Sequence, residues 1–344
     1  MSDWHAFLSA RGARIAEGVV ADFGDPAAEL ATGASGSVVC DLSQLGVLRF
    51  AGADALAFLH GQVSNDVKGL GGAHARYAGY CTPKGRLLAN FLLWREAEGI
   101  AMLLARDVLA GVEKRLRMYV LRSKVTVSDA TAEWVVLGAS GPAASAAVSA
   151  ALGVPAPTDP LGVARSDTGA LAIGVPGRRF VVVVPRAVSG SLWTRLAETL
   201  RPAGAPVWQW LEIAQGLPLV TTATQEELVP QMANLELVGG VSFDKGCYPG
   251  QEIVARSQYL GQVKRRTYRA GVEAPDAPRP GEPVYAGADA AQTAGIVVNA
   301  APAPGGGYEV LAALQTAAAL AGDLHLRTPD GPRLELRPLP YAVP

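Results

Sequence analysis

Lys245-Gly246-Cys247-Tyr248-Pro249-Gly250-Gln251-Glu252 is the stretch of this sequence that decides its fold. A lysine stands two residues before the cysteine, and a Pro-Gly pair separates the cysteine from an apolar run, Ile253-Val254-Ala255, that predicts the start of a helix. The N-terminus of a helix offers free backbone N–H groups and the positive end of its dipole. Both stabilise a thiolate, so Cys247 is a candidate nucleophile or metal ligand, and Lys245 would favour its ionisation.

The same residue types leave other interpretations open. Free cysteines are among the most buried residues, so spacing alone fits a packing role for Cys247 as well as a reactive one. Glu252 either complements the dipole of the predicted helix or, beside Gln251, binds the donor and acceptor groups of a ligand. Trp208 and Trp210 either pack in the core or provide an aromatic wall for a flat ligand.

Composition favours a globular protein of two or three domains. The chain has 344 residues, of which 49% are hydrophobic and 18% charged. A net charge of −1 argues against a dedicated nucleic-acid binder. The basic cluster formed by Arg256 and residues 264–266 is either solvated surface or a site for a carboxylate or an RNA phosphate.

Three cysteines and four scattered histidines exclude several classes of site. Cys40, Cys81 and Cys247 lie far apart without a Cys-x-x-Cys pair, which argues against a disulfide framework and a self-contained zinc site, so no metal site is expected. Residues 1–20 lack the pattern of a signal peptide, and no apolar run is long enough for a membrane helix. We therefore expect a cytoplasmic protein that does not contact membranes.

Hydrophobic periodicity predicts an α+β fold. Residues 1–36 are expected to be a loosely held lead-in. Segments within 133–200 follow the order β-α-β-β-α, which is typical of a ferredoxin-like unit. Beyond residue 261, short alternating segments between Pro- and Gly-rich turns predict a small β-barrel or sandwich.

Several blocks of this sequence resemble one protein family. The octapeptide at 245–252 is similar to the KGCYxGQE signature of the YgfZ-type folate-binding proteins, which are related to the T-protein of the glycine cleavage system. The resemblance spans roughly 40–344 and continues in the blocks at 52–54, 58–67, 84–86, 229–243, 254–256 and 339–341. Because the octapeptide occurs in register with these blocks, chance is a poor explanation for it.

The resemblance implies a T-protein-like architecture. Two interleaved ferredoxin-like, folate-binding α/β lobes would surround a central hole, followed by a C-terminal β-barrel. The corresponding domains are a lead-in over 1–36, one lobe formed by 37–130 and 205–260, a second lobe over 131–204, and the β-barrel over 262–344.

The resemblance also implies a function. Proteins of this type bind tetrahydrofolate and help to assemble or repair iron–sulfur enzymes, among them a radical enzyme that methylthiolates tRNA. A reduced folate is therefore the expected cofactor, and iron–sulfur enzymes or cluster-assembly proteins are the expected partners of a monomer, with RNA binding as a lesser alternative. Cys247 would be the reactive thiol, assisted by Lys245, Tyr248, Gln251 and Glu252. The residues assigned to folate contacts are Trp208, Asn65, Asp66, Asn90, Gln231, Asn234 and Arg256.

Two positions depart from the pattern of the related proteins. The T-protein carries an aspartate pair, one of them catalytic, where this sequence has Ala89 and Asn90. An amide cannot act as a general base, which favours the accessory role over a second hypothesis, a folate-dependent aminomethyltransferase. A third hypothesis is direct action as a tRNA-modification factor. The folate-binding tryptophans of a bacterial relative correspond to Trp208 and a position near Leu45, so half of that aromatic clamp is missing here.

Overall fold

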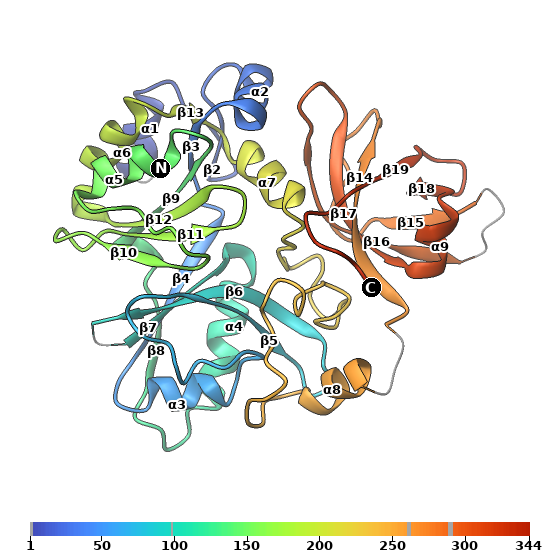
Figure 1. The fold of residues 1–344 in the computed structure, drawn as a ribbon, viewed down its shortest axis with the longest axis horizontal. Helices are drawn as coiled ribbons and strands as arrows, with labels where there is room; N and C mark the ends of the chain where they lie inside the picture. Colours follow the sequence, from blue (N-terminus) through green and yellow to red (C-terminus); the bar gives the residue numbers. More distant parts are fainter. Residues whose placement is uncertain (1–2, 98, 260–262, 288–291) are drawn as a thin grey trace.

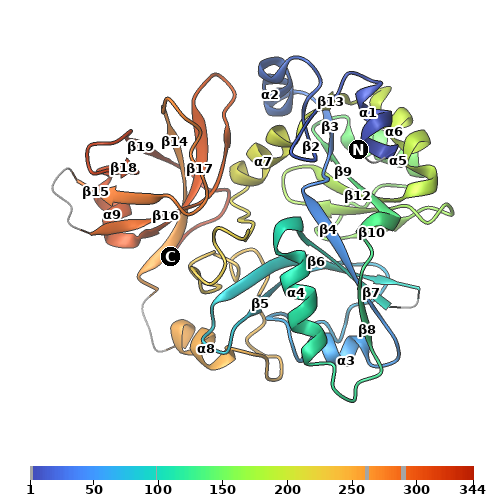
Figure 2. The same ribbon diagram turned by 180° about the vertical axis from the view of Figure 1, so that it is seen from behind.

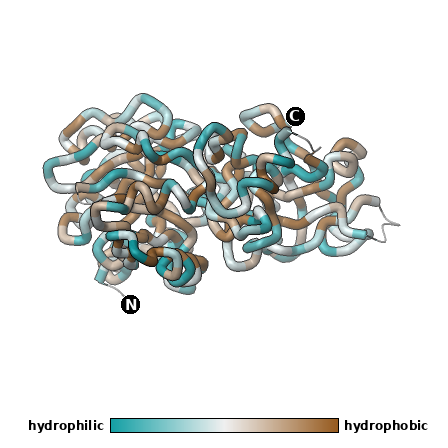
Figure 3. Tube along the Cα trace, turned by 90° about the horizontal axis from the view of Figure 1, so that it is seen from below, coloured by the Kyte–Doolittle hydropathy of each residue, from teal (hydrophilic) through white to brown (hydrophobic). Residues whose placement is uncertain are grey.

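Two α/β lobes and a curled C-terminal sheet make up the computed structural model, which describes residues 3–97, 99–259, 263–287 and 292–344 (Figures 1 and 2). Hydrophobic stretches run through the middle of both halves of the molecule, and many outer loops are hydrophilic (Figure 3). None of the helices in the described ranges is long and apolar enough to cross a membrane. The expected α+β, T-protein-like fold class is confirmed, whereas the exact domain bounds stay a prediction, with those at 260 and 262 lying outside the described residues.

The first α/β lobe contains a six-stranded sheet in the order β10-β11-β12-β9-β3-β13. β13 runs parallel to β3, and the other neighbours are antiparallel. The helices α1, α5 and α6 cover one face, where Leu8, Val148 and Trp193 are buried against the apolar run of β12. The elements of this lobe are α1 (Asp3–Ser9), β3 (Val38–Asp41), β9 (Trp134–Ser140), α5 (Ala144–Leu152), β10 (Val163–Arg165), β11 (Leu171–Val175), β12 (Arg179–Pro185), the short helix η2 (Arg186–Val188), α6 (Ser189–Ala197) and β13 (Arg201–Ala203). The predicted β-α-β-β-α order is found as β9-α5-β11-β12-α6, with β10 added at the edge.

The second lobe contains a five-stranded antiparallel sheet in the order β5-β6-β7-β4-β8. Helices α3 and α4 pack on its outer face, and the apolar stripe of α4, which includes Leu109 and Leu116, is buried there with Phe50 and Phe58. The elements are β4 (Leu45–Ala51), α3 (Ala55–His60), β5 (Arg76–Cys81), β6 (Leu87–Glu96), β7 (Gly99–Ala105), α4 (Arg106–Met118), β8 (Thr126–Asp129) and the short helix η1 (Thr131–Glu133).

The inner faces of the two sheets meet in a shared core. Cys40 and Val136 of the first sheet are buried in one cluster with Val47 and Leu103 of the second. Strands covered on both faces need continuous apolar runs, which explains why Ile100–Ala105 lacks an alternating pattern. Helix α7 (Ala205–Ala214) joins this core and lies between the lobes and the C-terminal sheet (Figure 1).

The N-terminal segment is folded into the first lobe, so the expectation of a loosely held lead-in is wrong. It forms α1, a hairpin of β1 (Arg14–Ala16) and β2 (Val19–Asp22), and α2 (Pro26–Ser35). Trp4 and Leu8 are buried in the core of the lobe because they lie on one face of α1. The carboxylate of Glu29 accepts hydrogen bonds from the backbone N–H groups of Phe23 at 2.7 Å and Gly204 at 2.9 Å. The segment therefore helps to hold the start of α7.

The C-terminal sheet curls into a half-barrel with the order β18-β15-β16-β17-β14-β19. One face encloses its own core, and the other packs Leu311 and Ala313 against Ile213 of α7 and Leu235. The elements are α8 (Gln251–Tyr259), which precedes the sheet, then β14 (Arg265–Val272), β15 (Pro283–Ala286), β16 (Thr293–Pro302), β17 (Tyr308–Gln315), α9 (Thr316–Ala321), β18 (Leu324–Leu326) and β19 (Leu334–Arg337).

Candidate functional site

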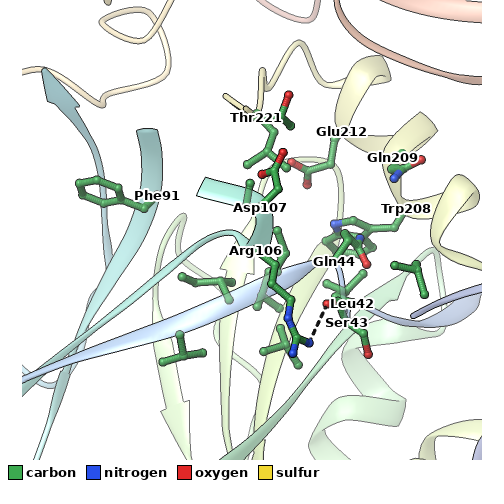
Figure 4. A pocket seen from close by; sticks show the side chains of 18 of the residues that line it. Leu42, Ser43, Gln44, Phe91, Arg106, Asp107, Trp208, Gln209, Glu212 and Thr221 are labelled. Carbon is green, nitrogen blue, oxygen red and sulfur yellow. Dashed lines mark hydrogen bonds between the residues drawn. The ribbon is translucent and has the colours of Figure 1, made fainter. Parts of the chain in front are cut away.

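A cavity of about 1400 Å³ lies where the two lobes, α7 and strand β16 of the C-terminal sheet come together. Figure 4 shows the side chains around it: Trp208 and Glu212 from α7, Phe91 from β6, and Arg106 with its neighbours from the start of α4. The connection between β3 and β4, residues 42–44, forms another part of the wall. The cavity therefore draws its walls from segments that are far apart in the sequence.

Trp208 owes its position to the way α7 begins. Gly204 precedes the helix and Pro206 stands in its first turn, where proline's fixed backbone angle and missing N–H suit a helix. The side chain is 3% exposed and packs against β9 at Gly138, where an added Cβ would lie 2.3 Å from the indole. Because Gly138 has no side chain, the indole can pack directly against the backbone of β9.

Glu212 lies one helical turn beyond Trp208, so both side chains point to the same side of α7. Its Oε1 accepts a hydrogen bond at 2.7 Å from Nη1 of Arg179, whose side chain is fully buried. The Arg179 guanidinium also donates to Pro176 O at 2.8 Å and lies 4.8 Å from the centre of the Trp208 ring. Arg179 thus fixes both residues, and Glu212 Oε2 has no hydrogen-bond partner among the described residues.

Three polar atoms of the wall are buried without a partner in the described part of the chain. They are Oε1 of Gln44, Nε1 of Trp134 and Oγ1 of Thr221. Buried polar groups are normally hydrogen-bonded, so unpaired ones around a cavity indicate a ligand or ordered water that pairs with them. Gln44 Oε1 is an acceptor, Trp134 Nε1 is a donor, and Thr221 Oγ1 can be either. Such a set matches a heteroaromatic ligand that carries both hydrogen-bond donors and acceptors.

The octapeptide lies outside this cavity, because none of residues 245–252 lines it. It is held by the other sequence blocks instead. Gly250 packs on the β5–β6 turn so closely that an added Cβ would lie 2.5 Å from Thr82 O and 2.6 Å from Gly85 Cα. The block at 58–67 also holds the segment just before the octapeptide, since Ser64 Oγ donates to Gly240 O at 2.7 Å.

Lys245 is a buried anchor of this arrangement. Its ammonium group donates to the carbonyl oxygens of His60 at 2.5 Å and Val63 at 2.6 Å, and lies 4.8 Å from the centre of the Tyr248 ring. Burial lowers the pKa of Lys245 to about 8, while the nearby Asp66 and Cys247 oppose that shift. Two carbonyls thus accept two of the three ammonium donors, and the expectation that Lys245 favours the ionisation of Cys247 stays a prediction.

The depressed pKa of Lys245 makes the stability of the protein depend on pH. Between about 8 and the ordinary value of 10.5, the unfolded chain binds more protons than the folded one. The free energy of unfolding should therefore rise with pH across this window, by about 2 kcal/mol. Urea unfolding of the wild type and of Lys245→Met at both ends of the window measures the effect. The other lysines and tyrosines contribute equally in the two proteins, so the difference between them reports Lys245. An equal rise of the free energy of unfolding in both would show that the pKa of Lys245 is not depressed in the folded protein.

Cys247 is exposed, whereas Cys40 and Cys81 are buried. The buried-cysteine interpretation therefore fits Cys40 and Cys81 and is wrong for Cys247. Burial raises the pKa of the Cys81 thiol to about 12 and that of Cys40 further still. No three His, Cys, Asp or Glu side chains converge to hold a metal ion within the described ranges.

Thiol labelling should separate the three cysteines. Because only a thiolate reacts and two thiols are buried with raised pKa values, iodoacetamide should label Cys247 alone in the folded protein, and all three cysteines in urea. Mass spectrometry of the digested protein gives the sites. The Cys247→Ser variant should stay unlabelled when folded, and labelling of Cys40 or Cys81 at the rate of Cys247 would refute this.

Comparison with known proteins agrees with this architecture. The GCVT N-terminal domain family matches residues 21–172. The tRNA-modifying protein YgfZ of Serratia proteamaculans is 32% identical over 294 residues, which cover 85% of this chain and 88% of that protein. This chain belongs to the YgfZ family. YgfZ of Sodalis glossinidius is 31% identical over 85% of this chain and 89% of its own.

The fold of this YgfZ-family chain is that of the T-protein. The crystal structure of glycine cleavage system aminomethyltransferase T from Bartonella henselae superposes with a TM-score of 0.81, covering 98% of this chain and 96% of that chain. At 18% identity this likeness shows the fold alone. The family and the fold expected from the octapeptide and its flanking blocks are both confirmed.

The residues that the YgfZ resemblance assigned to folate form two groups, those that line the cavity and those that lie outside it. Trp208 and Asn90 line the cavity. The Asn90 amide is held on both sides, since Nδ2 donates to Pro218 O at 2.7 Å and Oδ1 accepts from Val220 N at 2.8 Å. Asn90 therefore shapes the wall and fixes the segment after α7.

The other assigned residues lie outside the cavity. Nδ2 of Asn65 donates to the carbonyls of Tyr77 and Gly239 at 2.6 and 2.8 Å, and Asp66 lies 3.3 Å from Nδ1 of His60. Gln231 donates to Val254 O at 2.7 Å and therefore ties its loop to α8.

Asn234 and the polar residues of α8 are equally remote from the cavity wall. Asn234 has a positive φ of 54° and donates to Thr267 O at 2.7 Å, which ties its loop to β14. Glu252 and Arg256 pair with each other at 3.6 Å on the exposed face of α8, and Gln251 makes only a long hydrogen bond of 3.4 Å to Lys245 O. None of these residues lines the cavity, and the folate contacts that the resemblance assigned to them stay predictions.

Sequence reasoning missed Glu212, Gln44 and Trp134. The spacing of four between Trp208 and Glu212 on a predicted helix was the signal that could have found the first of them. The second tryptophan of the bacterial relative corresponds to a position near Leu45, where this chain has no aromatic residue. Trp134 lines the cavity from the other lobe, so a comparison of that position alone does not find it. Nothing local in the sequence marks Gln44 or Trp134, since their unpaired atoms appear only when the lobes meet.

Proposed function

We propose that this YgfZ-family protein binds tetrahydrofolate or a related reduced folate in the cavity between its lobes. The observation that carries the proposal is the pairing of a flat indole and a fixed carboxylate one helical turn apart, Trp208 and Glu212. A pterin ring is flat and presents adjacent N–H donors, from its amino group and ring nitrogen. The carboxylate would accept those donors, while the part of the indole that lines the cavity would make an apolar contact with the ring.

The remaining wall supports the same ligand. Gln44, Trp134 and Thr221 carry unpaired buried polar atoms that a pterin's further donors and acceptors would satisfy. A reduced folate supplies one-carbon chemistry when bound, but this chain offers no free base at Asn90, where both amide atoms are engaged by the backbone. We therefore propose binding of folate without aminomethyl transfer.

The thiol of Cys247 would act toward a partner protein. The cysteine is exposed and lies outside the cavity, so a reaction with the proposed folate is not its simplest role. We propose that the protein assists the assembly or repair of iron–sulfur enzymes and that its link to tRNA modification runs through such an enzyme. The name of its relatives, tRNA-modifying protein, supports this connection.

Titration of the purified protein with 5-formyltetrahydrofolate tests the folate proposal. Quenching of tryptophan fluorescence and calorimetry should both report saturable binding, and Trp208→Phe should bind less tightly because the smaller ring covers less of the ligand. Benzoylglutamate, which lacks the pterin, serves as the control ligand. Failure of the wild type to bind any reduced folate would refute the proposal.

Complementation of a deletion strain tests the role of Cys247. The Cys247→Ser variant should fold and bind folate like the wild type, because the thiol lies outside the cavity. It should fail to restore methylthiolated tRNA, because the exposed thiol that would act on the partner protein is lost. The matched control is Ser257→Ala on the neighbouring helix α8, which should complement fully. Full rescue by Cys247→Ser would show that the thiol is dispensable.

A further inference from the structure

The end of α4 and the turn after it expose three large apolar side chains within four positions. Met118 is 60% exposed and Leu121 is 86% exposed, and Tyr119 lies open between them. The described ranges contain seven exposed large apolar residues, so this short stretch holds an unusual share of them. The apolar stripe of α4 is already buried in the core of the second lobe and does not account for these side chains. We call residues 117–122 the turn surface.

Leu121 has a backbone conformation that leucine normally avoids. Its φ is +46°, in the left-handed region where Gly, Asn and Asp are the usual residues. The turn is closed by a hydrogen bond from Ser123 N to Val120 O at 2.8 Å, and a positive φ inside such a turn again favours glycine or asparagine. An exposed leucine under backbone strain lowers the stability of the protein, which indicates a role outside folding.

The backbone that presents Leu121 is held firmly. Lys124 N donates to the carboxylate of Asp54 at 2.7 Å, and Asp54 N donates to Lys124 O at 3.2 Å. Gly52 lies so close that an added Cβ would be 2.3 Å from Lys124 O. A partner that binds the turn surface would therefore not have to order it first.

Basic residues surround the exposed apolar group. The stretch from Lys114 to Lys124 contains five basic residues and no acidic one, although the whole chain has 30 basic and 31 acidic residues. Lys114, Lys124 and Arg122 are exposed, and none of them has a carboxylate within 4.0 Å in the described part of the chain. Arg117 pairs with Glu113 at 3.3 Å on the surface of α4. Such a surface complements an apolar pocket with an acidic rim.

Helix α3 connects the turn surface with the octapeptide. Asp54, which binds the backbone of Lys124, precedes the helix. His60, its last residue, accepts a hydrogen bond from Lys245. Six helical residues span about 9 Å, and Figures 1 and 2 show the turn after α4 and helix α8 in the same lower part of the molecule. An interface of usual size covers about 800 Å² on each partner, a disc about 30 Å across, so one partner can cover both regions.

A protein matches the turn surface better than a membrane or an RNA does. Arg, Met and Tyr are enriched in protein interfaces. A helix that binds a membrane surface lays a long apolar face into the lipid, but that face of α4 is buried in its lobe. RNA is bound by cations and by stacking on aromatic rings, to which Met118 and Leu121 contribute nothing.

We propose that the turn surface docks an acidic face of the partner protein on which Cys247 acts, with Leu121 as the apolar anchor. The proposal rests on the role of Cys247 proposed above. Docking here would hold the partner on the side of the molecule where the thiol is exposed. The basic residues would attract the acidic partner and raise its rate of association.

Interferometry with the purified tRNA-methylthiolating enzyme of the same organism tests the docking. Leu121→Asn should weaken binding about tenfold because the anchor is lost. The same variant should raise the midpoint of urea unfolding, because asparagine accepts a positive φ, and Leu121→Met should keep the affinity. Arg117→Gln/Arg122→Gln should slow association about tenfold and make it less dependent on salt. The control is Leu320→Asn in α9, a leucine with 84% exposure, which should bind like the wild type.

The outcomes separate the docking from the role of the thiol. Equal binding by the wild type, Leu121→Asn and the double arginine variant would overturn the docking surface and leave the role of Cys247 standing. A wild type that does not bind the enzyme would also overturn it, while complementation by Cys247→Ser decides the role of the thiol separately. The purified protein should neither sediment with phosphatidylglycerol vesicles nor bind tRNA through this surface. Either activity, lost in Leu121→Asn, would assign the surface to a membrane or to RNA and overturn the proposal.

Discussion

Replacing Glu212 with glutamine should weaken the binding of a reduced folate by about a hundredfold, because two charge-assisted hydrogen bonds from the pterin would become neutral or mismatched. The carboxylate is fixed by Arg179 at 2.7 Å, so an amide in its place would have to present an oxygen to Arg179 and an N–H group toward the ligand donors. Calorimetric titration with 5-formyltetrahydrofolate measures the loss.

The same substitution should also destabilise the protein, since it leaves the positive charge of a fully buried arginine uncompensated. Removing one partner of such a pair costs about 3 kcal/mol in the free energy of unfolding. The double variant Glu212→Gln/Arg179→Met should regain much of this stability without regaining folate affinity. Glu198→Gln on the exposed end of α6 is the matched control. Wild-type folate affinity in the Glu212→Gln variant would exclude Glu212 from the site.

Replacing Gly138 with alanine should displace the Trp208 indole and abolish most folate binding. An added Cβ would lie 2.3 Å from Trp208 Cε3, well inside contact distance, and Gly138 lies on a central strand that cannot easily move. Overpacking of this kind costs about 1–3 kcal/mol in the free energy of unfolding. Urea unfolding, folate titration and the tryptophan emission spectrum would record the three effects.

The control for this substitution is Gly111→Ala in α4. Gly111 is exposed within the helix and an added Cβ meets nothing within 4 Å, so alanine there should stabilise the protein by up to about 1 kcal/mol. Folate binding by Gly111→Ala should be unchanged. If Gly138→Ala kept both the wild-type emission spectrum and the wild-type affinity, the indole would not be part of the binding wall.

Local patterns accounted for much of the fold. The apolar run after the octapeptide predicted a helix, which is α8, and the periodicity within residues 133–200 predicted the β-α-β-β-α order that the first lobe shows. The blocks that flank Cys247 also identified the family and hence the T-protein-like architecture. The N-terminal 36 residues were the main failure, because their small and polar residues suggested a loose segment while Trp4, Leu8 and Glu29 are held by partners far along the chain.

The octapeptide and its flanking blocks determined the family of this protein, and the octapeptide with the apolar run after it determined a cysteine segment before a helix, because both depend on residues that are close in the chain. The exposure of that cysteine depends on the fold. Only the tertiary structure decided that the segment lies outside the large cavity and that Lys245 serves as a buried anchor. It also decided the cavity wall, where Glu212 meets Arg179 and Trp208 rests on Gly138. Those contacts join residues from different strands and helices, and their distances are fixed by the packing of two sheets rather than by spacing along the sequence.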